Sequence, residues 1–229
     1  MTIFSYLNSP AEMLIMIGIR LLIVFTILPV HEYAHAFAAK KMGDNTALMA
    51  GRLTLNPIAH VDLFGALFLV LFGFGWAKPV PINPRNFRNY KKGIAITAVA
   101  GPLANLICAA LGIFVFNVLL YVPITRSLVD VFFYIVIAVE YFAMINISLA
   151  VFNMIPITPL DGSRLLSTVV SYKVNYFMSK YQQYIYLGFL LLLLTGVLQR
   201  PMTWIINLVY SGINLLFFWV EPLMRAIFC

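Results

Sequence analysis

The sequence predicts an all-α polytopic membrane protein with about five transmembrane helices, plus a re-entrant segment with a short β-strand or hairpin. Hydrophobic residues make up 62% of the 229 residues and charged residues only 10%. Apolar runs long enough to cross about 30 Å of hydrocarbon recur along the chain. The net charge of +7 comes from basic residues scattered between these runs. This pattern is typical of membrane topology signals and does not predict a nucleic-acid-binding surface.

The first predicted span covers residues 13–39 and ends at Lys40 and Lys41. Paired lysines after a span favour the cytoplasmic side. No basic residue precedes the span, so we expect no cleaved signal peptide.

Residues 47–62 read differently from the spans around them. Side chains alternate between polar and apolar from Arg52 to Leu55, which predicts a short strand, and Asn56 with Pro57 predicts a turn. The apolar run 63–77 that follows is too short to cross and contains glycines. Basic residues flank it on both sides, so we expect it to be re-entrant.

Four further spans are predicted at residues 93–122, 131–154, 184–198 and 202–228. No internal repeat or soluble domain separates them. We expect one membrane-embedded domain over residues 1–229, with a core at about 13–172 and accessory C-terminal helices at about 183–228. Glu140 lies within the 131–154 span, where pairing inside the bundle is its expected role.

The strongest motif is His31-Glu32-Tyr33-Ala34-His35, inside the first span. Side chains four residues apart share one face of a helix, so both imidazoles can reach one zinc ion. Glu32 is well placed to take a proton from zinc-bound water. At 1.5 Å per residue, His31 lies about 14 Å from Lys40, so the site is expected toward the cytoplasmic face.

A catalytic zinc ion usually takes three protein ligands and one water. Asp161 is the favoured third ligand, because it follows a proline-interrupted break at which polar groups can line a cavity. An alternative role for Asp161 is to cap the following helix. His60 is a rival third ligand, although it is more simply interpreted as an interfacial or substrate-side residue.

Two asparagines and the predicted strand are candidates for contact with substrate. Asn153 lies where the third long span breaks, so its amide could bind a substrate carbonyl or a developing oxyanion, or could instead cap exposed backbone. Asn105 has the same two readings. A strand edge could pair with an unwound substrate backbone. The strand residues are Gly51, Arg52, Leu53, Thr54, Leu55 and Asn56.

Together these motifs resemble the site-2 protease family of intramembrane zinc metalloproteases. The matching segments are His31 to His35, Gly51 to Pro57, Gly75 to Pro81, Gly101-Pro102 and Asn153 to Gly162.

The resemblance implies a three-helix core that binds zinc through His31, His35 and Asp161, with Glu32 activating water. It also implies that Asn153 helps to bind substrate or to stabilise the transition state. The PDZ and CBS domains of many relatives are not found in this sequence, so it resembles the small form of the family.

The sequence therefore predicts a zinc endopeptidase, with one Zn²⁺ per chain, that cuts within or near the transmembrane segment of another membrane protein. The expected location is the plasma membrane, as a multi-pass protein in contact with the lipid bilayer. A catalytically silent relative that only binds membrane proteins is one alternative, and the intact Glu32 argues against it. A zinc transporter is another, but its donors would line a path across the whole bilayer.

Overall fold

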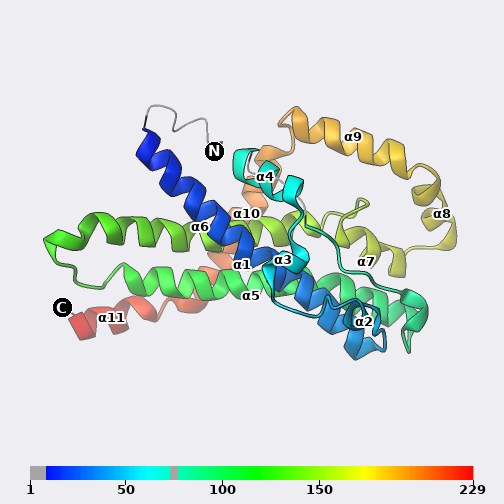
Figure 1. Cartoon of the computed structure of the whole chain (residues 1–229), viewed down its shortest axis with the longest axis horizontal. Coiled ribbons are helices and arrows are strands. Elements are labelled where there is room, and N and C mark those ends of the chain that lie inside the picture. The colour runs from blue at the N-terminus through cyan, green and yellow to red at the C-terminus, as the bar shows by residue number, and fades with distance from the viewer. Residues whose placement is uncertain (1–8, 73–76, 229) are drawn as a thin grey trace. The chain divides into compact units, whose positions relative to one another are not determined.

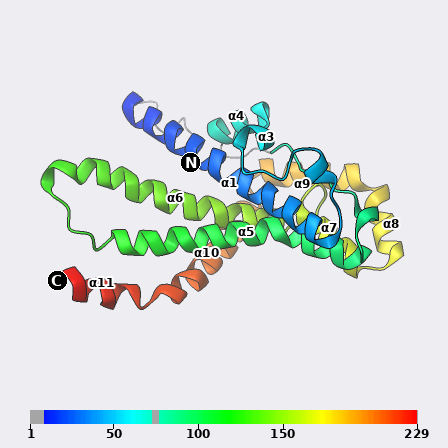
Figure 2. The same ribbon diagram turned by 60° about the horizontal axis from the view of Figure 1, so that its bottom comes forward.

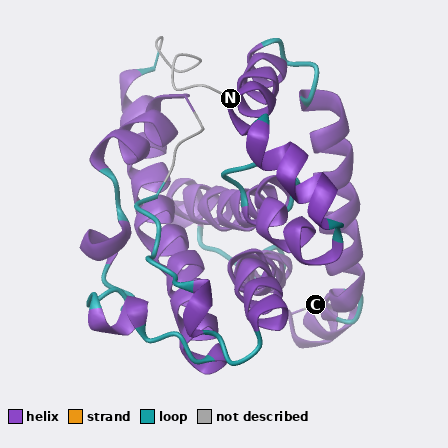
Figure 3. Ribbon diagram, turned by 90° about the vertical axis from the view of Figure 1, so that its right-hand side faces the viewer, coloured by secondary structure: helices purple, strands orange, loops and turns teal. Residues whose placement is uncertain are grey.

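A computed structural model describes residues 9–72 and 77–228, and these residues form helices joined by turns and loops (Figure 3). The chain divides into two compact units, Met1–Ala104 and Asn105–Cys229. The boundary falls inside helix α5 (Tyr90–Leu119), which is continuous (Figure 1). The predicted single domain over residues 1–229 stays a prediction.

The first unit is built on α1, a helix of 33 residues (Pro10–Met42) drawn in blue in Figure 1. Gly43 ends the helix in the left-handed region, with φ 111°. Its N–H donates to the carbonyl of Lys40 at 3.1 Å, and the N–H of Asp44 donates to that of Ala39 at 2.9 Å. These bonds satisfy carbonyls that the helix end would otherwise leave unpaired.

Three short helices pack against α1 in this unit. They are α2 (Thr46–Met49), α3 (Pro57–His60) and α4 (Leu63–Phe72), and a 3-10 turn, η2 (Pro84–Asn86), follows them. Val61 and Ala77 form an isolated antiparallel bridge, and the N–H of Lys78 donates to the carbonyl of His60 at 2.8 Å. The two ends of the predicted re-entrant run 63–77 therefore lie together. Within that run, Gly73 and Gly75 lie outside the described residues.

The predicted strand over Gly51 to Asn56 is wrong, because short-range bonds hold this segment in turns and bends. Gly51 is left-handed, with φ 66°. The carbonyl of Thr54 accepts a bond from His60, and its hydroxyl accepts from the N–H of Asn56. The side chain of Asn56 in turn caps α3 by accepting from the N–H of Ile58 at 3.1 Å. Local side-chain bonds of this kind compete with a strand ladder, so this segment presents no strand edge to a substrate.

The second unit begins with the last part of α5, which runs antiparallel to α6 (Val129–Asn153) (Figure 2). Ala109 and Ile113 of α5 and Ala143 and Ile147 of α6 form its buried core. Gly112 permits the close approach, because a Cβ there would lie 3.1 Å from the Cβ of Ala143. The remaining helical elements are η3 (Arg126–Leu128), α7 (Asp161–Val169), α8 (Tyr172–Lys180), α9 (Gln182–Leu194), α10 (Gln199–Asn214), η4 (Leu215–Phe217) and α11 (Val220–Phe228).

Three helices among the described residues are long and apolar enough to cross a membrane: Glu12–Met42, Tyr90–Leu119 and Arg126–Asn153. They confirm a multi-pass membrane protein. The sequence predicts about five spans, and the described residues hold three candidates, or four if a bent helix pair is counted as one span. The last two predicted spans, 184–198 and 202–228, correspond to helices that together could form one bent span, because the pair Gln182–Leu194 and Gln199–Phe217 is bent by 84°. A Gly196 with φ 72° lies at this bend.

The fold predicts that residues 42 and 85 face the same side of the membrane. The N–H of Arg88 donates to the carbonyl of Met42 at 3.0 Å, so the chain returns to the end of α1 after the run 63–77. In a protein whose native cysteines are replaced by serine, Met42→Cys and Arg85→Cys should react with an impermeant thiol reagent from the cytoplasmic side only. Thr125→Cys, beyond the α5 span, should react from the opposite side. Labelling of residues 42 and 85 from different sides would show that the run 63–77 crosses the membrane.

Candidate metal centre

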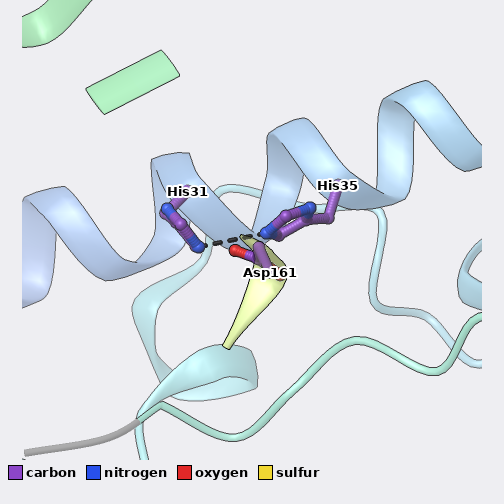
Figure 4. Close-up of side chains that lie close together, drawn as sticks. All are labelled: His31, His35 and Asp161. Atoms are coloured by element: carbon purple, nitrogen blue, oxygen red, sulfur yellow. Dashed lines mark hydrogen bonds between the residues drawn. The ribbon is translucent and has the colours of Figure 1, made fainter. Parts of the chain in front are cut away.

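His31 and His35 lie one turn apart on α1, and both side chains are buried, with exposed fractions of 7% and 5%. They project from the same face of the helix, and their Nε2 atoms are 3.0 Å apart (Figure 4). Pro29, two residues before His31, lies inside the same helix. The spacing predicted from the motif is therefore what the fold produces.

The Thr97 carbonyl on α5 fixes the ring of His35. His35 Nδ1 lies 2.7 Å from this oxygen, and a carbonyl can only accept, so Nδ1 carries the proton. In a neutral ring, Nε2 of His35 would then carry the lone pair, which is the form that binds a metal. A metal ion held by both rings would bind their Nε2 atoms, which face one another.

Gly101 of α5 leaves the space into which the two imidazoles fit. A Cβ at this position would collide with His35 Nε2 and would lie 2.6 Å and 2.7 Å from Cε1 and Nε2 of His31. The ligand atoms of both rings therefore converge on the bare backbone of one glycine. Two neutral imidazole donors that converge in a buried space are what zinc requires, so this pair fits the metal.

Glu32 directly follows His31 in the sequence, and its side chain is buried. Its carboxylate accepts a hydrogen bond from a segment outside α1. The backbone N–H of Val80 donates to Glu32 Oε2 at 2.9 Å. Val80 lies between Pro79 and Pro81, which have no N–H. The carboxylate thus has a fixed partner although it lies within a long apolar helix.

Asp161 is the first residue of α7, and its side chain is buried. The N-cap position is Leu160, so the alternative role of Asp161 as the helix cap is not what the fold shows. A Cβ on Gly162 would lie 2.7 Å from the Ile155 carbonyl oxygen and would also collide with the Met154 carbonyl. The backbone of Met154 and Ile155, just after the end of α6, therefore packs directly on the Asp161-Gly162 backbone. This contact explains why glycine follows this aspartate.

The remaining predicted residues occupy different settings. His60 is fully buried in α3, and its Nε2 donates to the Thr54 carbonyl at 2.7 Å, so it holds the preceding turn and is not supported as a metal ligand. Asn153 is the last residue of α6 and is half-buried. Asn105 lies one turn after Gly101 on α5 and is fully buried. Neither atom of its amide has a hydrogen-bond partner among the described residues, which is costly unless another group binds there.

Comparison with known proteins finds one matching family and several similar proteins, of which two are described. The sequence model of the protein family described as "Peptidase family M50" matches residues 131–195. "Putative zinc metalloprotease YwhC" of Bacillus subtilis (strain 168) is 38% identical over 196 residues, covering 83% of this chain and 85% of the relative. "Putative zinc metalloprotease Rip2" of Mycolicibacterium smegmatis (strain ATCC 700084 / mc(2)155) is 27% identical over 192 residues, covering 80% and 68%. No solved structure matches significantly.

Adding one methyl group at Gly101 should displace the histidine pair. In Gly101→Ala the Cβ overlaps both rings, so we expect most of the zinc that co-purifies with the wild-type protein to be lost. The matched control is Gly18→Ala on α1, where nothing lies within 4 Å of the added Cβ. Elemental analysis of the purified proteins measures the difference. Equal zinc in both variants would contradict the convergence of the rings on Gly101.

Proposed function

This chain belongs to peptidase family M50, a family of zinc metalloproteases, and from that premise we propose that it is an intramembrane endopeptidase. Its substrate on this proposal is a peptide bond within or near the transmembrane segment of another membrane protein. The single observation that carries the proposal is the placement of Glu32 beside two converging imidazoles inside a helix long enough to span a membrane.

We propose that one zinc ion per chain is held by His31, His35 and Asp161, all three of which are buried. These two imidazoles and one carboxylate would leave room for a water molecule on the metal ion. When bound, the zinc ion polarises a carbonyl oxygen and lowers the pKa of its water to about 7. His60, the rival third ligand, is engaged with its own turn.

The protein residues then have distinct tasks in hydrolysis. Glu32 accepts a proton from the attacking water, whose oxygen bonds to the scissile carbonyl carbon. As the C–N bond breaks, Glu32 passes this proton to the leaving nitrogen, so the carboxylate ends the cycle unchanged. The overall reaction is the addition of one water molecule across the peptide bond.

Asn153 and Asn105 are proposed to bind the substrate. The buried amide of Asn105 offers two donors and an acceptor, and an unwound peptide backbone has the complementary groups. For Asn153, the supporting feature is its place at the last residue of α6, immediately before the break that leads to Asp161. Its amide would donate to a substrate carbonyl.

The proposed setting is the plasma membrane, with the site toward the cytoplasm. Lys40 and Lys41 lie in the last turn of α1, nine or ten residues after His31, which favours this side. The joined ends of the run 63–77 support its prediction as a re-entrant segment. We further propose that residues 1–229 act as one domain, with the core at about 13–172 and accessory helices at about 183–228.

Replacing Glu32 by glutamine should abolish cleavage and leave zinc in place. Glutamine keeps an oxygen that can accept the Val80 N–H, but an amide cannot take the proton. Incubating the purified protein with a panel of single-span membrane proteins tests this, with wild-type protein plus and minus chelator as controls. A loss of at least about 10³-fold is expected. Cleavage by Glu32→Gln at the wild-type rate would assign the base elsewhere.

A further inference from the structure

Residues 78–83, together with the 3-10 turn η2 (Pro84–Asn86) that follows them, form a segment that we call the strap. Within its run Pro79-Val80-Pro81, Val80 has the only backbone N–H, since proline has none. That single donor is used on Glu32 Oε2, at 2.9 Å. A hydrogen bond from a neutral donor to a carboxylate is among the stronger ones in proteins, especially where water is excluded.

The strap is fastened on the side that precedes Val80. The N–H of Lys78 donates to the His60 carbonyl at 2.8 Å. The guanidinium of Arg52 donates through Nη2 to the carbonyl of Lys78 at 2.6 Å and to that of Pro79 at 3.3 Å. Arg52 therefore binds the strap carbonyls, which the sequence motif alone did not indicate.

On the other side, the strap is fastened by Asp44, which directly follows Gly43 at the end of α1. Its Oδ2 accepts from the N–H of Asn83 at 2.7 Å, and its Oδ1 accepts from Asn86 Nδ2 at 2.8 Å. Both the N–H and the hydroxyl of Thr46 also donate to Oδ1. Asp44 is completely buried. It joins the end of α1, the start of α2 and the strap at one carboxylate.

Hydrogen bonds to the Asp44 carboxylate favour its ionised form. Burial acts to raise its pKa, but the hydrogen bonds from Thr46, Asn86 and Asn83 outweigh burial and hold the pKa below its ordinary value. The carboxylate therefore stays charged at neutral pH, and each of its bonds to the strap is charge-assisted.

Between these two sets of hydrogen bonds, the strap lies against α1. The side chain of Val80 is 5% exposed and belongs to the same small core as Ala36 of α1 and Ala47 of α2. Gly43 permits the close approach further along, because a Cβ there would lie 3.1 Å from the carbonyl oxygen of Asn86. All of these contacts belong to the unit Met1–Ala104.

We propose that the strap orients the catalytic carboxylate of Glu32. The Val80 N–H fixes the position of Glu32 Oε2, and Asp44 acts as a positioning residue because its hydrogen bonds fix the position of the strap. This inference rests on the proposed role of Glu32 as the base. With Oε2 anchored, Oε1 is the oxygen that takes the proton from water, and the side chain is kept from swinging to bind the metal itself. Misplacement of a catalytic group by about 1 Å can cost about 10²-fold in rate.

The first test measures the contact directly, without activity. Because Pro79 and Pro81 have no amide hydrogen, a proteolytic fragment from Lys78 to Pro81 reports hydrogen exchange at Val80 alone. We expect Val80 to exchange at least about tenfold faster in Glu32→Ala and in Asp44→Ala than in the wild type. The matched control is Asp62→Ala, which removes another carboxylate of this unit, one that accepts from the N–H of Gly65 at the start of α4. An unchanged Val80 rate in Glu32→Ala and Asp44→Ala would overturn the proposal.

The second test separates orientation from folding by replacing the Val80 amide with an ester. The ester keeps the valine side chain and removes only the N–H; valine introduced by the same suppression method is the control. We expect kcat to fall about 10- to 100-fold, with KM and zinc content within about twofold of the control. An ester protein with the kcat of the control would overturn the proposal.

A double-mutant cycle then tests whether Asp44 acts through Val80. Asp44→Asn should lower kcat in the wild-type background and have little further effect when Val80 carries the ester. Fully additive losses would mean that Asp44 has only a separate structural role. A different result would count against the proposed function, namely that the wild-type protein does not cleave membrane-protein substrates. The hydrogen-exchange experiment tests the contact between Val80 and Glu32 whether or not cleavage is observed.

Discussion

Hydrogen bonds between buried polar side chains of α1 and backbone groups of other segments organise the candidate metal centre. Two imidazoles and a carboxylate lie within a helix of 33 residues that is apolar enough to cross a membrane. In hydrocarbon each unsatisfied polar group costs several kcal/mol, so such a helix is stable only if neighbouring segments supply the bonds. Backbone groups supply two of them: the Thr97 carbonyl for His35 and the Val80 N–H for Glu32.

Backbone partners have a consequence for the chemistry. A carbonyl cannot donate and an N–H cannot accept, so each partner fixes the hydrogen-bonding role of the atom that it contacts. Nδ1 of His35 is held as a donor, and Oε2 of Glu32 is held as an acceptor. Gly101 is the sequence feature that lets the α5 backbone lie this close to both imidazole rings.

The local parts of the site could be predicted from the sequence, because they depend on helix geometry. The spacing of His31 and His35 places both rings on one face, and the Nε2 contact of 3.0 Å is what that spacing produces. The partners of these residues could not be predicted, because Thr97 and Val80 come from distant segments and act through backbone atoms, which no residue type reveals. The Pro-Val-Pro run was a usable signal, since it leaves one donor in three residues.

The errors in the fold prediction have physical causes as well. The alternating pattern from Arg52 to Leu55 predicts a strand, but the carbonyl of Thr54 and the N–H of Asn56 are taken by nearby side chains. The C-terminal apolar run reads as two spans by composition. Gly196, in the left-handed region, instead lies at a bend of 84° between Gln182–Leu194, which at 13 residues is short for a span, and Gln199–Phe217.

The account depends most on the identity of the zinc ligands. X-ray absorption at the zinc edge of the loaded protein measures them directly, and Asp161→Ala is the comparison that isolates the third ligand. We expect two imidazole nitrogens at about 2.0–2.1 Å with oxygen donors at about 2.0–2.2 Å in the wild type, and a changed first coordination shell in Asp161→Ala. Three imidazoles in the wild type, or an identical spectrum in the variant, would contradict the assignment of His31, His35 and Asp161.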